Sequence, residues 1–224
     1  MNKQLINGIR QLVSVSEHDS IDSIVSQYIE QHYCEADITK TQFYPSQIAS
    51  KYFCINKEVL RRILGNRVDK KEQSLIRIFD IGIVLHALWQ NRYLGPARLL
   101  VGDWQCVCGF TTYGWMPRDI CPTCGKKDLF KYSEPRLMYH LDENNVISGY
   151  ADGIIMLRDE KIVLEMKTVS GSAFLKIKKP ETWHIIQLNI AMGILHLVKG
   201  KLLYISKQDN LIKEFDILVF IVKV

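Results

Sequence analysis

Hydrophobic residues recur at helical spacing in the first part of the chain and form short, near-continuous runs in the second part. The spacing and the cap residues predict helices over about residues 20–29, 46–52, 56–65, 69–93 and 182–200. The apolar runs predict strands over about residues 135–141, 147–157, 161–168, 201–207 and 211–223. The longest helix has apolar residues around much of its surface, so we expect its middle to be buried. This order of elements predicts an α/β fold with a central mixed sheet flanked by helices.

Charged residues interrupt two of the most apolar predicted strands. Asp152 precedes one apolar run, and Glu165 and Lys167 directly follow another, with a turn between the two runs. Because side chains alternate between the faces of a strand, Glu165 and Lys167 share one face while Met166 points into the core. Such charges are costly in a buried strand unless they are paired or bind a metal, although a solvated ion-pair face is the alternative interpretation. Two carboxylates beside an amine favour a site for a hard divalent cation, the arrangement needed to hydrolyse a phosphodiester.

The composition is that of a globular chain with a mild positive charge. The 224 residues, 47% of them hydrophobic, can form one large domain or a domain with an insertion. The net charge of +5 and the pI of about 8.8 permit a polyanionic partner without requiring one. No apolar run reaches the ~18 residues of a membrane span, and the polar start of the chain is unlike a signal peptide. We therefore expect a cytoplasmic protein with no membrane partner.

Four of the six cysteines form a spaced set, Cys106, Cys108, Cys121 and Cys124. In a cytoplasmic chain this spacing indicates a metal site rather than disulfides. Four thiolates fit structural zinc best, with an iron–sulfur cluster as the alternative. The many turn residues around them, and the absence of a long helical or strand period, predict a small metal-stapled insertion over about residues 101–131. The isolated Cys34 and Cys54 are expected to be buried small residues.

Several motifs in order along about residues 42–207 resemble the RecB-like branch of the PD-(D/E)XK nucleases, which includes lambda-type and CRISPR-associated RecB-like exonucleases. The resemblance is carried by Pro45-Ser46-Gln47, Gly82-X3-His86-X3-Gln90, Glu134-Pro135-Arg136, Gly149-X2-Asp152, Glu165-X-Lys167-Thr168 and His184-X2-Gln187-Leu188. One departure is Ala191, where the family often has a tyrosine near the substrate strand. The thiolate set also differs from the iron–sulfur cysteines of some members, because no cysteine follows Cys124.

The resemblance implies a restriction-endonuclease-like core over residues 41–224, preceded by a helical segment over 1–40 and interrupted by the zinc-ribbon-like insertion. It also implies that Asp152, Glu165, His86 and the Met166 carbonyl hold Mg²⁺ or Mn²⁺, with a hydrogen-bonded core histidine as the alternative for His86. Lys167 would then position the attacking water or help to deprotonate it.

The resemblance gives further residues supporting roles. Gln187 would bind the lysine, the water or a DNA phosphate, and Glu134 is either a further ligand through water or a surface acid near a turn. Lys176, Lys178 and Lys179 would follow the DNA backbone or, alternatively, form a solvated charge run.

The activity implied by the resemblance is a metal-dependent DNA nuclease. An exonuclease on DNA ends or single strands, working in replication, recombination or repair, is favoured over a structure- or sequence-specific endonuclease. A non-catalytic zinc-containing adaptor on a nuclease fold is the third alternative. The chain has no helicase-like P-loop, so a helicase or another replication or recombination protein is a possible partner. The implied location is a bacterial cytoplasm or that of a virus-infected host cell.

Overall fold

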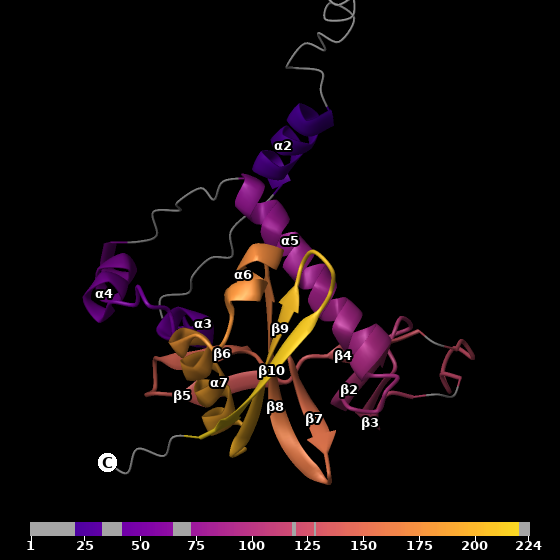
Figure 1. The fold of residues 1–224 in the computed structure, drawn as a ribbon. Helices are drawn as coiled ribbons and strands as arrows, with labels where there is room; N and C mark the ends of the chain where they lie inside the picture. The colour runs from indigo at the N-terminus through magenta and orange to yellow at the C-terminus, as the bar shows by residue number, and fades with distance from the viewer. Residues whose placement is uncertain (1–20, 33–41, 65–72, 118–119, 128, 220–224) are drawn as a thin grey trace, which may run out of the picture. The chain divides into compact units, whose positions relative to one another are not determined.

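The computed structural model describes residues 21–32, 42–64, 73–117, 120–127 and 129–219 (Figure 1). The chain forms two compact units, residues 1–37 with 67–78 and residues 38–66 with 79–224, and each unit is considered by itself. The helices are α2 (Ile21–His32), α3 (Pro45–Ile48), α4 (Ile55–Leu64), α5 (Gln73–Leu88), the π-helix η2 (Trp89–Leu94), α6 (Gly171–Lys176) and α7 (Thr182–Ile194). The strands are β1 (Gln42–Phe43), β2 (Val101–Cys106), β3 (Thr111–Trp115), β4 (Phe130–Ser133), β5 (Arg136–His140), β6 (Val146–Tyr150), β7 (Gly153–Leu157), β8 (Glu160–Val169), β9 (Lys199–Ser206) and β10 (Ile212–Leu218).

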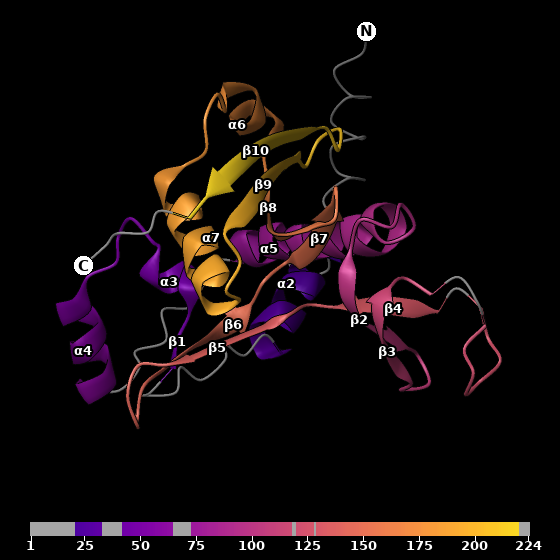
Figure 2. The same ribbon diagram turned by 90° about the horizontal axis from the view of Figure 1, so that it is seen from below.

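The central sheet of the larger unit has the strand order β10-β9-β8-β7. Strand β8 runs parallel to β9 and antiparallel to β7, and β9 runs antiparallel to β10, so the sheet is mixed. The predicted fold class, α/β with a central mixed sheet and flanking helices, is confirmed. Figure 2 shows α6 and α7 beside β8–β10, with β2–β4 at the other side of the sheet.

Strand β8 is buried on both faces, as its apolar run predicts. Val163 packs in one hydrophobic cluster with residues of α7. Leu164 and Met166 pack in a second cluster with Trp104 and Tyr132, which belong to the cysteine-containing module of residues 101–133. Odd-numbered positions of β8 therefore face α7, and even-numbered positions face the module. The hairpin to β7 turns through two residues with positive φ, Arg158 and Asp159, which suits a two-residue turn between antiparallel strands.

The segment predicted as one strand over residues 147–157 is two strands in two different sheets. Strand β6 pairs with β5 and β1, whereas β7 pairs with β8. Ala151 and Asp152 lie where the chain leaves the first sheet and enters the second, and the Ala151 amide donates to the Pro135 carbonyl. Asp152 therefore lies on an irregular connection between two strands. The alternation of side chains along a strand does not determine the direction of its side chain there.

Helix α7 ends earlier than its hydrophobic pattern predicts. It was expected to reach Gly200, but it stops at Ile194 and His196 has a φ of 55°. Gly200 instead lies in β9, where an added Cβ would come within 2.5 Å of the Met192 Sδ atom. The glycine thus serves close packing between strand and helix rather than helix termination.

The cysteine-containing module is richer in strands than predicted. Strands β3, β2 and β4 form an antiparallel sheet within residues 101–133. Each strand is only four to six residues long, so no extended period marks it in the sequence. The boundaries predicted for this insertion and for the segment 1–40 stay predictions.

Helix α5 differs from its prediction in two ways. The expected helix over 69–93 changes to the π-helix η2 at Trp89. Its middle was expected to be buried, yet Ile83 and Val84 are 64% and 65% exposed. An apolar pattern around the whole helix predicted burial, but apolar residues also occur on protein surfaces. No described helix is long and apolar enough to cross a membrane.

Two smaller predictions before α5 need correction. The helix predicted to start at residue 56 starts one residue earlier, because α4 begins at Ile55 and the Glu58 amide donates to the Cys54 carbonyl. Cys54 is exposed rather than buried, which follows from its position just before a helix on the surface. Cys34 lies outside the described residues.

Candidate active site

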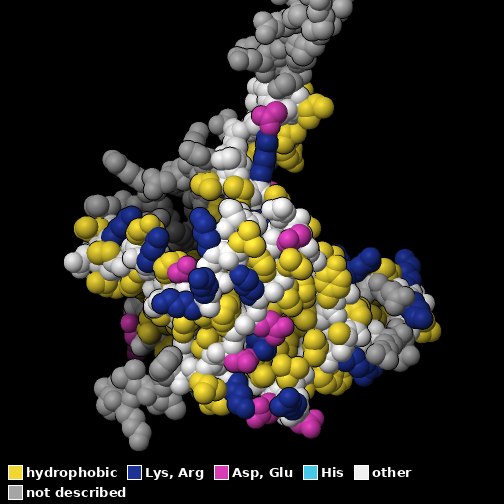
Figure 3. Space-filling model, in the orientation of Figure 1, with side chains coloured by type: hydrophobic (Ala, Val, Ile, Leu, Met, Phe, Trp, Pro, Cys, Tyr) yellow, Lys and Arg dark blue, Asp and Glu magenta, His cyan; other side chains and the backbone are white. Residues whose placement is uncertain are grey.

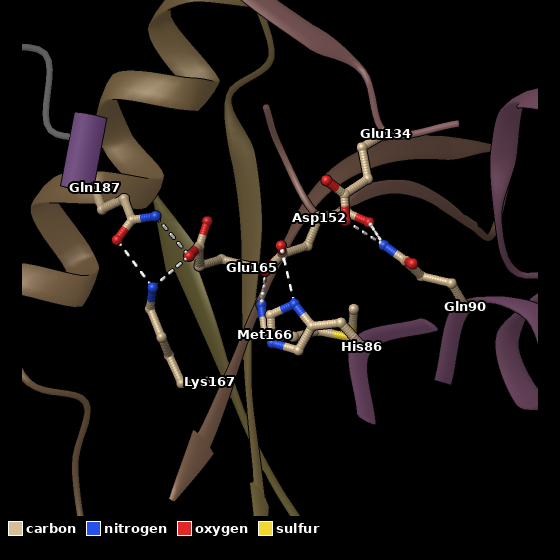
Figure 4. A network of polar contacts seen from close by, with 8 residues as sticks. All are labelled: His86, Gln90, Glu134, Asp152, Glu165, Met166, Lys167 and Gln187. Atoms are coloured by element: carbon tan, nitrogen blue, oxygen red, sulfur yellow. Dashed lines mark hydrogen bonds and ion pairs between the residues drawn. The ribbon is translucent and has the colours of Figure 1, made fainter. Parts of the chain in front are cut away.

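Three potential metal ligands meet at one end of the central sheet (Figure 4). They are His86 in the last turn of α5, Glu134 between β4 and β5, and Asp152 on the connection between β6 and β7. One donor atom from each side chain lies within 4.8 Å of the others, and all three residues are partly buried. The His86 Nδ1 atom is 3.3 Å from the Asp152 Oδ1 atom. An imidazole and two carboxylates in this arrangement could hold a divalent cation.

The Asp152 carboxylate is fixed by the backbone of the neighbouring strand. The Met166 amide donates to its Oδ2 atom at 2.5 Å, while the Oδ1 atom faces His86. Because the backbone of β8 holds the Oδ2 atom, the Oδ1 atom is the one that faces the other potential metal ligands. The site thus depends on the register at which β7 and β8 meet.

Glu165 and Lys167 lie on the same face of β8, as predicted, and both contact a side chain of α7. The Lys167 Nζ atom is 2.6 Å from the Glu165 Oε1 atom and donates to the Gln187 Oε1 atom at 2.9 Å. The Gln187 Nε2 atom in turn donates to the Glu165 Oε1 atom at 2.7 Å. Glu165 is only 3% exposed, so its carboxylate requires such partners. Both contacts use the Oε1 atom, and Glu165 is not in the group formed by His86, Glu134 and Asp152.

The ionisable groups influence one another strongly. Burial, together with the charge of Asp152, raises the pKa of Glu165 to about 7, although Lys167 opposes this shift. Burial also raises the pKa of Glu134, against a hydrogen bond from Gln90. For His86, burial acts to lower the pKa, but the hydrogen bond and charge of Asp152 outweigh it and the pKa is raised. Burial is thus the largest cause of both raised carboxyl pKa values, and the charge of Asp152 adds to it.

Gln90 is a site residue that the sequence analysis placed in a motif but did not assign. It is 4% exposed, and its Nε2 atom donates to the Glu134 Oε1 atom and to the Asp152 carbonyl, both at 2.8 Å. It therefore fixes one ligand directly and the backbone of another. Its position four residues after His86 was a usable signal, because such residues share one side of a helix. The change to a π-helix at Trp89 then sets its direction.

Gly82 brings α5 close enough to β8 for His86 to reach Asp152. A Cβ atom at Gly82 would lie 3.1 Å from the Thr168 Oγ1 atom. We expect Gly82→Val to move the helix and cost about 1–3 kcal/mol of stability. It should also raise the metal concentration needed for any activity of the site.

The matched control for Gly82→Val is Gly193→Ala in α7, where an added Cβ has nothing within 4 Å. This variant should be neutral or more stable by up to about 1 kcal/mol. Chemical denaturation and metal titration of both variants measure the two effects. Equal behaviour of both would show that the packing at Gly82 does not position His86.

The predicted DNA-binding lysines are on the surface of the same unit. Lys176 is the last residue of α6, and Lys178 and Lys179 lie in the connection to α7; all three are exposed. Figure 3 shows lysine and arginine side chains scattered over one face of the molecule, interspersed with hydrophobic ones. The structure does not bring these three lysines into the ligand group.

The four spaced cysteines do come together. The Sγ atoms of Cys106 and Cys124 are 3.7 Å apart, those of Cys108 and Cys121 are 3.6 Å apart, and all four lie within 4.8 Å of one another. A metal–sulfur distance of about 2.3 Å gives a tetrahedron with sulfur atoms about 3.8 Å apart, whereas a disulfide has them about 2.05 Å apart. The observed distances thus fit one tetrahedral ion. Two of the module's turns contain positive-φ glycines, Gly109 and Gly125.

Backbone amides also prepare one of the thiols for metal binding. Burial acts to raise the pKa of Cys121, but hydrogen bonds from the amides of Cys124 and Thr123, with smaller contributions from neighbouring thiols, lower it to about 6. The pKa of Cys106 is raised to about 12, since burial and the neighbouring thiols outweigh the amide of Cys108. A bound cation would favour the thiolate form of all four cysteines.

Comparisons with known proteins give only distant similarities. No protein-family model and no curated protein matches the chain. The crystal structure of SSO0001 has a TM-score of 0.49 and 17% identity, over 89% of this chain and 78% of that one. The crystal structure of an alkaline exonuclease from Laribacter hongkongensis has a TM-score of 0.48 and 14% identity, over 80% of this chain and 78% of that one. Similarities of this degree carry no conclusion about the activity of this chain.

Proposed function

We propose that the protein is a metal-dependent nuclease that hydrolyses phosphodiester bonds in DNA. The observation that carries the proposal is the adjacency of two groups at the end of one sheet. His86, Glu134 and Asp152 form a cation-binding cluster, and Lys167 lies beside it on β8, held by Glu165 and Gln187. The anionic cluster would bind a cation, and the amine of Lys167 would contact an anionic substrate held by that cation.

His86, Asp152 and Glu134 would hold Mg²⁺ or Mn²⁺, with Glu165 and the Met166 carbonyl as further ligands. The cation would supply Lewis-acid polarisation of the phosphate and a lowered pKa for a bound water. The donor set fits because it combines carboxylate oxygens, preferred by magnesium, with an imidazole that manganese accepts readily. The negative charge of the carboxylates would then be balanced.

Lys167 is proposed to hold the attacking water and to offset negative charge that develops on the phosphate. Its Nζ atom has two anchors, Glu165 and Gln187, so its side chain is fixed before substrate arrives. Gln187 contacts both partners and is a positioning residue that maintains their distance. This preorganisation lowers the cost of orienting the amine during the reaction.

The cysteine cluster is proposed to hold one structural zinc ion. Four thiolates would complete the tetrahedron and leave no ligand position for water, which separates this site from the candidate active site. The module contacts the central sheet through Tyr132, whose hydroxyl donates to the Val101 carbonyl and accepts from the Ile154 amide. Zinc would therefore stabilise β2 and β4, which pack against the strand following Asp152.

An exonuclease on DNA ends or single strands is the favoured activity, and an endonuclease is the alternative. A time course on end-labelled linear single strands, linear duplexes and closed circles with Mg²⁺ or Mn²⁺ distinguishes the two, since only an endonuclease cuts circles. Mononucleotide release from linear DNA is the expected result. Tight binding without cleavage of any DNA or RNA form would instead support a non-catalytic adaptor.

Replacement of His86 by alanine is expected to raise the Mn²⁺ concentration required for cleavage, at least by the roughly tenfold typical of residues around a metal site. The reason is the loss of the imidazole that lies 3.3 Å from Asp152. Metal titration of the cleavage rate measures the effect, and His140→Ala, an exposed histidine on β5, is the control. A lower melting temperature with an unchanged metal requirement would indicate a packing role only.

A further inference from the structure

An exposed aromatic and cationic surface lies next to the candidate active site. It consists of Trp183 at the start of α7 and of Lys51 and Tyr52 after α3, and we call it the stacking patch. The Lys51 Nζ atom is 5.2 Å from the centre of the Trp183 ring and 4.8 Å from that of the Tyr52 ring. Tyr52 is 77% exposed and Lys51 is exposed, while Trp183 is half-buried. Aromatic faces with a lysine beside them are the elements that bind unpaired bases and their phosphates.

Contacts with His184 and, through it, with the buried Tyr204 hold the indole of Trp183 in place. Its Nε1 atom donates to the His184 Nε2 atom at 3.1 Å, and the His184 Nδ1 atom is 2.8 Å from the Tyr204 hydroxyl oxygen. Tyr204 is fully buried, and its hydroxyl also accepts from the Glu181 amide. A chain of contacts therefore runs from the core of the sheet to the exposed ring. Because the ring is fixed, less conformational entropy is lost when a ligand packs on it.

Trp183 is joined to the candidate active site by one turn of helix. It precedes Gln187 by four residues, so the two side chains lie on the same side of α7. Gln187 contacts both Lys167 and Glu165. Four helical residues span about 6 Å, which is on the order of two base steps of about 3.4 Å along one strand. A strand with a phosphate at Lys167 could thus bring a nearby base to the indole.

The charges around the patch suit a nucleic-acid strand. Lys51 lies on the patch, and the exposed Lys176, Lys178 and Lys179 are in the segment that leads into α7. Lys51 interacts with the two rings when no strand is bound, and its flexible side chain can turn to a phosphate when a base takes its place. Every base has an aromatic face, so such a surface is tolerant of sequence.

We propose that Trp183, with Tyr52 and Lys51 beside it, stacks one unpaired base of the substrate, so that the strand is single-stranded where it enters the active site. The proposal rests on the proposed function and specifies the substrate form. A base on the indole has left its own stack, which is incompatible with an intact duplex at that position. Single strands and duplexes with frayed ends should therefore be better substrates than blunt duplexes.

Binding of a labelled single-stranded oligonucleotide in EDTA tests the proposal without cleavage. Trp183→Ala should weaken binding on the order of tenfold, the scale of one lost base–aromatic contact, while Trp183→Phe should retain most of the affinity. The control is Trp115→Phe in β3, which should bind like the unmodified protein. Oligonucleotides with one abasic position, moved stepwise along the strand, should bind less tightly to the unmodified protein at one position only. Trp183→Ala should show no such position.

Two results would contradict the stacking role of Trp183. If Trp183→Ala is folded by circular dichroism and binds every oligonucleotide as tightly as the unmodified protein, the stacking role is wrong. The same conclusion follows if the abasic effect persists in Trp183→Ala. These binding results do not depend on cleavage, so an inactive protein that shows the position-specific effect would contradict the proposed function and still support the stacking patch.

Discussion

Glu165→Gln and Lys167→Ala are each expected to reduce turnover by about two orders of magnitude or more, the scale for loss of one acid–base or electrostatic group. Lys167→Ala removes the amine that two side chains hold in place. Glu165→Gln removes a buried charge that anchors this amine and is proposed to bind the cation. Both variants act on the chemical step, so the rate at saturating DNA, measured by release of labelled nucleotide, should fall in each.

Matched controls for these variants lie on the same strand. Glu160 and Lys161 are exposed residues at the opposite end of β8, and Glu160→Gln and Lys161→Ala should leave turnover unchanged. Lys167→Ala should still bind DNA, because the proposed phosphate contacts of the surface lysines remain. If Glu165→Gln and Lys167→Ala cleave at the rate of the unmodified protein, the activity lies at another site or comes from a contaminant.

The effect of chelation follows from the same arrangement. EDTA should stop cleavage by the unmodified protein without releasing bound DNA, provided that the ion of the cysteine cluster exchanges slowly. Without a cation, the carboxylates of Asp152 and Glu134 would repel a phosphate at the reacting position. Addition of Mn²⁺ or Mg²⁺ in excess should restore the rate.

The central part of the candidate site was predictable because strand alternation is a local property. Two positions apart on one buried strand, Glu165 and Lys167 had to share a face. The same rule places Met166 on the opposite face, where it is fully buried. The direction of the Glu165 carboxylate was not predictable, because it depends on Gln187, which belongs to a helix distant in sequence.

Other features depend on contacts that no local pattern contains. Gln90 receives its role from two partners, Glu134 and Asp152, that reach it through tertiary folding. The end of α7 was misplaced because Leu195 and Leu197 continue the helical spacing beyond Ile194, where the helix ends, while the chain turns at His196. In both cases the residue types were compatible with the structure, but packing decided the outcome.

The apolar pattern of α5 shows a further limit of sequence reasoning. Hydrophobicity around a helix predicted burial, and Ile76 is indeed buried, whereas Ile83 and Val84 are exposed. The hydrophobic pattern shows which residues of a helix can be buried. It does not show whether another part of the protein covers them. Gly82 was part of a sequence motif, but its packing role on this helix follows only from the distance to Thr168.

Cys121→Ser is expected to remove the zinc ion proposed for the cysteine cluster and to lower the melting temperature sharply. Structural zinc contributes about 10–16 kcal/mol of apparent binding free energy in zinc-finger peptides, and Cys121 is fully buried at the centre of the module. The module shares a hydrophobic cluster with β8, including Trp104, Tyr132 and Leu164. Loss of the ion should therefore destabilise the packing of the central sheet as well as the module.

The measurement combines elemental analysis with thermal denaturation. The unmodified protein should contain one zinc per chain, and Cys54→Ser, which changes an exposed cysteine outside the cluster, should keep both the zinc and the melting temperature. Cleavage per folded molecule should fall less than stability in Cys121→Ser, because the four clustered cysteines form a group separate from His86, Glu134 and Asp152. Iron in place of zinc, or no metal in freshly purified protein, would contradict the assignment. A loss of cleavage as large as that of Lys167→Ala, in a Cys121→Ser protein that remains folded, would mean that the module acts on the active site itself, through the hydroxyl of Tyr132 that joins Val101 to Ile154.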